Sequence, residues 1–166
     1  MKLQPGDIFF QTSGTTLDII INFFQALWSG DKRSIFSHTG IVVNEDGTTF
    51  ETSPWRTGYF NLNSRRGRKT IVAILRHTHM RYLQTNLHAC YLNGVIYPYW
   101  RLPLFALGLA GIIHWHNMVC SEIVADLLTN LGLRKSRWGV SVDKLLDDMM
   151  SDPNWEAVYQ GFGLEE

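Results

Sequence analysis

The sequence predicts an α+β fold in which helices pack on an antiparallel sheet. Three observations predict this class. Short runs of β-branched and aromatic residues, bounded by turn residues, are typical of strands. The run Asn44-Glu45-Asp46-Gly47 has the composition of a hairpin turn, which joins antiparallel neighbours. Apolar residues at helical spacing then predict helices between and after the strands.

The strands are expected mainly in the first half of the chain. A turn at Gly6-Asp7 leads into a short buried strand, and the hairpin turn separates a strong strand from a partner that Pro54 ends. In chain order, the expected strands cover residues 6–11, 35–43, 48–53, 59–62, 70–76 and 155–159.

Four helices are expected along the chain. Thr15 and Asp18 are placed as a capping box for the first, and Ser141 opens the last. In chain order, the expected helices cover residues 17–28, 80–91, 120–131 and 142–149. No repeat or linker interrupts the 166 residues. Residues 1–166 are therefore expected to form one domain with a sizeable core.

The helix expected at 120–131 begins with a cysteine. Cys120 is the first residue of an apolar stripe, so its sulfur should face whatever the helix packs on. Asn117 is placed as the N-cap and Gly132 as the residue that ends the helix. Unpaired backbone N–H groups at a helix start favour a thiolate. The alternative interpretation is that Cys120 is a small apolar core residue.

A histidine and a glutamate on the two hairpin strands are the candidate partners of this cysteine. Side chains alternate along a strand, so His38 and Gly40 share one face. A four-residue loop places Glu51 opposite Gly40 and diagonal to His38. A two-residue loop keeps Glu51 on that face, whereas a three-residue loop turns it away. Gly40 is expected to leave the space between the two side chains open.

These residue types together predict nucleophilic catalysis. A carboxylate bonded to one imidazole nitrogen fixes the ring and favours the imidazolium, and the other nitrogen can take a thiol proton. Cys120 is then the nucleophile, His38 the base and Glu51 the residue that orients it, if the cysteine helix packs its stripe on the face of His38. Backbone amides at the helix start become candidate oxyanion donors. The alternatives are a histidine bonded to backbone and a glutamate in solvent.

Four motifs follow one another along the chain: Leu3-Gln4-Pro5-Gly6-Asp7-Ile8, Phe36-Ser37-His38-Thr39-Gly40-Ile41, Phe50-Glu51 and Val119-Cys120-Ser121-Glu122. With Tyr97-Pro98-Tyr99 and residues 140–146, they resemble the circularly permuted NlpC-type papain-like cysteine hydrolases, especially the YiiX-like branch. The resemblance implies a permuted papain-like fold and gives Cys120, His38 and Glu51 the same three roles. It also implies action on peptidoglycan-type peptides, other isopeptides or lipid acyl groups.

Other polar and aromatic residues are candidates for binding a substrate or a metal. Tyr97, Tyr99 and Trp55 are expected to contact substrate, although most buried aromatic residues belong to a core. The pairs His77/His79 and His114/His116 lack a third ligand at motif spacing, and a zinc site needs three or four. We therefore expect no metal and no cofactor.

Charge and hydropathy narrow the class of partner and the location. The formal net charge is zero, which gives no field to attract nucleic acid, and the basic cluster at 65–69 is expected to be a solvated loop. The N-terminus lacks an apolar signal segment, so a cytoplasmic location is expected. Residues 102–113 are apolar but shorter than the roughly 20 residues of a membrane span. They are expected to form a buried helix or to cover a site, with membrane contact as the lesser alternative.

The leading hypothesis is a cysteine hydrolase that cleaves an amide, isopeptide or ester bond through an acyl-enzyme. One alternative is a catalytically inactive module on the same fold that binds a peptide or a protein. Another, which depends on the apolar segment, is a lipid acyltransferase or a phospholipase-like activity.

Overall fold

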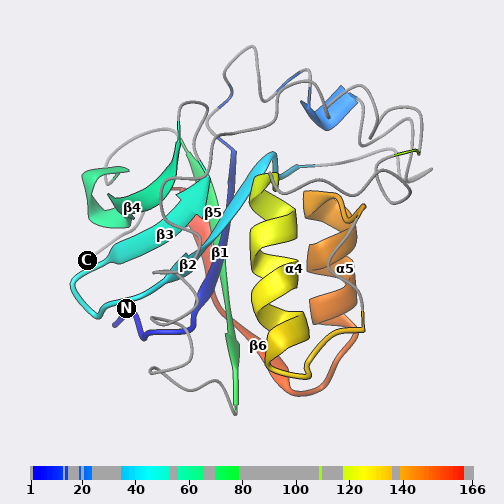
Figure 1. Cartoon of the computed structure of the whole chain (residues 1–166). Helices are drawn as coiled ribbons and strands as arrows, with labels where there is room; N and C mark the ends of the chain where they lie inside the picture. Colours follow the sequence, from blue (N-terminus) through cyan, green and yellow to red (C-terminus); the bar gives the residue numbers. More distant parts are fainter. Residues whose placement is uncertain are drawn as a thin grey trace.

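The architecture is a curled antiparallel sheet with two helices on one side of it (Figure 1). The computed structural model describes residues 2–12, 14, 19, 21–23, 35–52, 56–65, 70–78, 109, 118–135 and 139–162. The strands are β1 (Ile8–Thr12), β2 (His38–Val42), β3 (Thr48–Thr52), β4 (Thr57–Asn61), β5 (Ile71–His77) and β6 (Trp155–Phe162). The helices are α4 (Cys120–Asn130) and α5 (Val142–Met150), with a 3-10 turn η1 (Leu62–Arg65).

The sheet has the strand order β4-β3-β2-β1-β5-β6, and every neighbouring pair is antiparallel. The α+β class is thus confirmed. The short strand predicted at 59–62 begins two residues earlier, and it ends at Asn61 because Leu62 starts η1. The last strand continues to Phe162.

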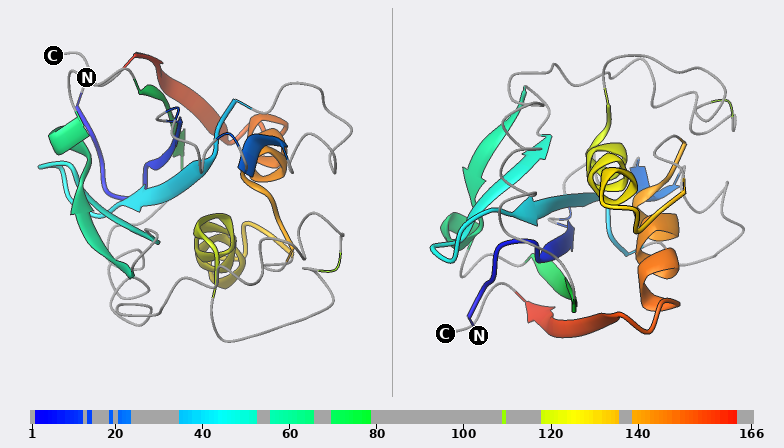
Figure 2. Two further views of the ribbon diagram at one scale, coloured as in Figure 1. Left: turned by 90° about the horizontal axis from the view of Figure 1, so that it is seen from above. Right: turned by 60° about the horizontal axis from the view of Figure 1, so that its bottom comes forward.

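Both faces of the sheet are buried, which explains why Ile8-Phe9-Phe10 is apolar without alternation. Apolar residues of α4 and α5 pack with Ile8, Phe10 and Ile41 of the sheet. We call all of these residues together the helix-side cluster. Phe9 and Val42 point to the other face, into an inner cluster with Leu3, Leu62, Val72 and Ile74. Seen from above, the sheet curls and both helices lie outside the curve (Figure 2).

Helix α4 begins later than its predicted cap. Its N-cap is Val119, not Asn117, which lies outside the described residues. Val119 has no polar side chain, but its carbonyl accepts the Glu122 N–H (3.0 Å), and the Glu122 carboxylate accepts the Val119 N–H (3.2 Å). The predicted end is confirmed: Gly132 has φ 74°, and Leu133 N–H donates to Leu128 O (2.8 Å).

The predicted cap of α5 is also confirmed, since the Ser141 hydroxyl accepts the Lys144 N–H at 3.2 Å. Of the helix expected at 17–28, only residues 19 and 21–23 are described, and they are helical. The helix expected at 80–91 and, apart from Leu109, the apolar segment 102–113 lie outside the described residues. In the described part of the chain, no helix has the length and hydropathy of a membrane span.

A buried ion pair joins the N-terminal segment to β5. Arg76 Nε and Nη2 each lie 2.8 Å from an oxygen of Asp7, and the Gln4 N–H donates to the same carboxylate. The Asp7 side chain is 1% exposed and that of Arg76 is 23% exposed. The aspartate of the Gly-Asp-Ile motif therefore links the segment before β1 to the neighbouring strand β5.

Asp7→Ala is expected to lower the free energy of unfolding by about 3 kcal/mol, because it leaves a partly buried guanidinium without its carboxylate. Lys2→Ala is the matched control, since Lys2 and its partner Glu45 are exposed (72% and 57%). It should cost less than about 1 kcal/mol. Urea unfolding of both variants measures the difference. Equal losses in the two variants would contradict the structural role assigned to Asp7.

Candidate active site

The β2–β3 hairpin has the four-residue register. Gly40 pairs with Glu51, and Val43 N–H donates to Thr48 O at 2.8 Å, which leaves residues 44–47 as the loop. Gly47 has φ 87°, a conformation that favours glycine. The first of the predicted registers is thus confirmed, and Glu51 lies diagonal to His38.

The sequence suggested that Gly40 leaves an open space between His38 and Glu51, but the structure shows that this space is filled. A Cβ atom at this position would lie 2.7 Å from Glu51 Cβ and 2.7 Å from Phe9 Cε1. The glycine is required because these two side chains already fill the region. The Phe9 ring also lies against His38, with ring centroids 6.0 Å apart. Close packing around Gly40 therefore holds both site residues.

Glu51 is a buried ion-pair partner of His38. Its side chain is 1% exposed, and its Oε2 bonds His38 Nε2. The solvent-exposed glutamate that sequence left as an alternative is therefore excluded. The second carboxylate oxygen, Oε1, accepts the Thr49 hydroxyl at 2.7 Å. Thr49 was missed, although its spacing of two residues from Glu51 on a strand places both on one face.

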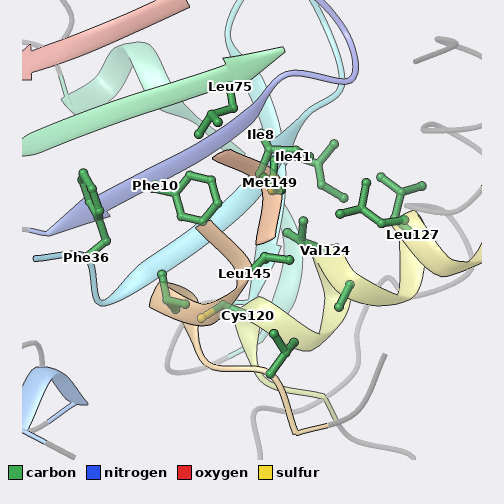
Figure 3. Packing of buried hydrophobic residues seen from close by; sticks show 14 of the residues in the cluster. Ile8, Phe10, Phe36, Ile41, Leu75, Cys120, Val124, Leu127, Leu145 and Met149 are labelled. Carbon is green, nitrogen blue, oxygen red and sulfur yellow. The ribbon is translucent and has the colours of Figure 1, made fainter. Parts of the chain in front are cut away.

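Cys120 reaches the same imidazole from α4. The residue is 5% exposed and packs in the helix-side cluster, at the start of α4 and one turn before Val124 (Figure 3). Its thiol also acts on His38, because its interaction with the imidazole raises the pKa of that ring. The core interpretation and the imidazole contact are thus both correct for this residue. The structure therefore brings the three predicted residues together: Glu51 bonds the imidazole, and Cys120 raises its pKa.

We expected α4 to pack on the face of the sheet that carries His38, but it packs on the opposite face. The stripe of α4 packs on Ile41 and Phe10, which alternate with Gly40 and Phe9 and so lie on the opposite face from Glu51. His38 is the first residue of β2 and lies beyond the last pair that β2 makes with β3. At this strand end, the imidazole is accessible to a helix on one face and a carboxylate on the other.

The two contacts determine the charge of the ring. Burial by itself lowers the pKa of His38, but the hydrogen bonds with Cys120 and Glu51 outweigh it and raise the pKa to about 10. The imidazole side chain is 18% exposed, so solvent screens the pair weakly. Near neutral pH, His38 is therefore an imidazolium that lies between the Glu51 carboxylate and the Cys120 sulfur.

Ser121 and Glu122 anchor the start of α4. The Ser121 hydroxyl donates to Val140 O at 2.6 Å, and the Glu122 carboxylate accepts the Gly139 N–H at 3.1 Å. Both side chains are buried, so the Cys-Ser-Glu motif joins the cysteine to the segment before α5. The N–H groups of Cys120 and Ser121 have no intrahelical partner, which suits them to bind an oxyanion.

The remaining predicted site residues lie elsewhere or outside the described part. Trp55, Tyr97 and Tyr99 are outside it, as are Cys90 and every histidine of the two metal-like pairs except His77. His77 is buried with its ring edge against Trp155, at 4.9 Å between centroids. Within the described residues, no three His, Cys, Asp or Glu side chains are placed to hold a metal ion.

The fold resembles that of a solved structure. The chain is similar to a protein described as metalloprotein yiiX, DUF1105, from Escherichia coli O157:H7. The superposition has a TM-score of 0.69 at 20% sequence identity and covers 98% of this chain and 99% of the other. No protein-family model and no curated protein sequence matches the chain. At this identity, the likeness concerns the fold alone.

Proposed function

We propose that the chain is a thiol-dependent hydrolase with a permuted papain-like, NlpC-type fold, which cleaves an amide, isopeptide or ester bond. The observation that carries the proposal is that His38 interacts with both residues: Glu51 bonds its ring, and Cys120 raises its pKa. A thiol at a helix start, beside an imidazolium that a buried carboxylate orients, is the arrangement of an activated nucleophile. The fold shared with yiiX is compatible with the YiiX-like resemblance.

The chemistry then proceeds in two stages. The Cys120 sulfur, having given its proton to His38, attacks the substrate carbonyl carbon, and the N–H groups of Cys120 and Ser121 stabilise the oxyanion. His38 returns the proton to the departing amine or alcohol, which leaves a thioester on Cys120. A water molecule gives a proton to His38 and attacks this thioester, and the carboxylic acid leaves as the sulfur recovers its proton. Glu51 remains ionised throughout and stabilises the imidazolium.

The name of the structural relative raises the question of a metal. In this chain, His38 Nε2 and Glu51 Oε2 bond each other directly instead of converging on a shared ion. A metal therefore does not fit between them, and the mechanism uses none. Treatment with EDTA is expected to leave both turnover and the reactivity of Cys120 unchanged.

The pH dependence of iodoacetamide alkylation tests the proposal without a known substrate. His38 keeps its proton to about pH 10, and a cation beside a sulfur increases the reactivity of that sulfur. The alkylation rate of Cys120 should reach half its maximum well below the pH of about 8.5 expected of a free thiol. Mass mapping separates Cys120 from Cys90. An inert Cys120 favours the alternative of a binding module on the same fold.

A further inference from the structure

The Thr49 hydroxyl donates to Oε1 of Glu51, the carboxylate oxygen that does not bond His38. Glu51 uses Oε2 for His38 and Oε1 for Thr49 Oγ1, at 2.7 Å from the hydroxyl. Thr49 is fully buried, and β-branching fits it to strand β3 whether or not it has a hydroxyl. Valine has nearly the same shape as threonine and could fill this buried position. Packing alone therefore does not explain why residue 49 carries a hydroxyl.

The Glu51 carboxylate needs this support because its side chain has several rotatable bonds. A glutamate has three side-chain torsions, and each rotation about them moves Oε2 away from the imidazole. The packing at Gly40 restrains its Cβ, whereas the Thr49 hydroxyl restrains its far end. A hydrogen bond to the ionised carboxylate also favours the charged form that pairs with His38.

We propose that Thr49 is a positioning residue of the catalytic machinery, which orients Glu51 and keeps it ionised so that His38 stays poised against Cys120. This inference rests on the proposed function. It adds a fourth member to the chain of contacts, Thr49–Glu51–His38–Cys120, which begins on β3 and ends at the first residue of α4. Among the described residues, Glu51 and Cys120 are the titratable groups that act on the His38 charge.

Thr49→Val tests the inference because it removes the hydroxyl and keeps the shape. The pH at half-maximal alkylation of Cys120 is expected to rise by about one unit, which is about a tenfold loss of reactivity below it. Turnover should fall through kcat, with little change in KM, since Thr49 acts through Glu51 and not on substrate. Thr49→Ser keeps the hydroxyl and should restore the wild-type profile.

Thr39→Val is the matched control. Thr39 is equally buried, and its hydroxyl donates to the Phe9 carbonyl at 2.7 Å, so its loss tests a purely structural hydrogen bond in the neighbouring strand. The pH profile of this variant should match that of the wild type. In a Glu51→Gln background, Thr49→Val should add less than about a twofold effect, because its target carboxylate is gone.

The outcomes separate this inference from the proposed function. A wild-type Cys120 as inert as a free thiol overturns the proposed function itself. A reactive wild-type Cys120 whose pH profile is unmoved by Thr49→Val overturns the role of Thr49 alone, as does an equal shift in Thr39→Val. If Thr49→Val does not fold, Thr49→Ala removes the same hydroxyl without placing a second methyl group against the carboxylate. The pH profile of Cys120 alkylation in this variant then tests the role of Thr49.

Discussion

Cys120→Ala is expected to abolish turnover while leaving the fold intact. Removing a nucleophile that acts with its base as a unit costs at least about 10⁴-fold in rate. The substitution deletes one buried sulfur from the helix-side cluster, which should cost about 1 kcal/mol of unfolding free energy. Rates with peptide, isopeptide and ester substrates measure the first effect, and urea unfolding measures the second.

Val124→Ala is the control for packing. Val124 lies one turn further along α4 in the same cluster and is fully buried, and its side chain has no group that can bond His38 or Glu51. Its truncation should cost at least as much stability as Cys120→Ala and leave turnover within about twofold of wild type. Retained activity in Cys120→Ala contradicts the nucleophile assignment, and unfolding of that variant shows that the sulfur has a structural role instead.

Glu51→Gln is expected to lower kcat by about 10²-fold, the lower end of what a well-oriented base contributes. Glutamine keeps the size of the side chain but loses the charge that stabilises the imidazolium. The pH at half-maximal alkylation of Cys120 should rise toward that of a free thiol. Glu45→Gln is the control, because Glu45 is an exposed carboxylate in the same hairpin. Equal rates in the two variants would rule out an electrostatic role for Glu51.

The same ion pair makes the stability of the fold depend on pH. Native His38 keeps its proton to about pH 10, whereas an unfolded histidine loses it near 6.5. The stabilisation is therefore complete below pH 6.5 and is lost as the pH rises toward 10. In Glu51→Gln, the pKa of His38 is lower and this loss of stability should be smaller. Urea unfolding across that range checks the slope, and parallel slopes in both proteins contradict it.

Local rules predicted the described strands and the helices α4 and α5, and they limited the hairpin to a few registers. The composition of residues 44–47 restricts the loop, and strand alternation then places Glu51 on the face of His38, as the Gly40–Glu51 pair confirms. The glycine that ends α4 and the serine that opens α5 were predicted for the same reason, since backbone caps depend on a few neighbouring residues.

Features that depend on tertiary packing were not predictable in this way. The N-cap of α4 moved to Val119 because a buried carboxylate three residues later satisfies its N–H. The side of the sheet on which α4 packs depends on both sheet faces being buried, which a continuous apolar strand does not reveal. The crowding at Gly40 comes from Phe9, on a neighbouring strand 31 positions away (40 − 9). The catalytic roles and the contacts of Trp55, Tyr97 and Tyr99 with substrate remain predictions.

The most direct test of the central claim is to trap the acyl-enzyme. Wild-type protein is mixed with activated ester, peptide and isopeptide substrates, quenched in acid and weighed intact, and the modified peptide is then mapped. We predict a mass increase equal to the acyl group, located on Cys120, transient in the wild type and absent from Cys120→Ala. Turnover of a substrate without any adduct on Cys120, or an adduct that survives in Cys120→Ala, would contradict the account.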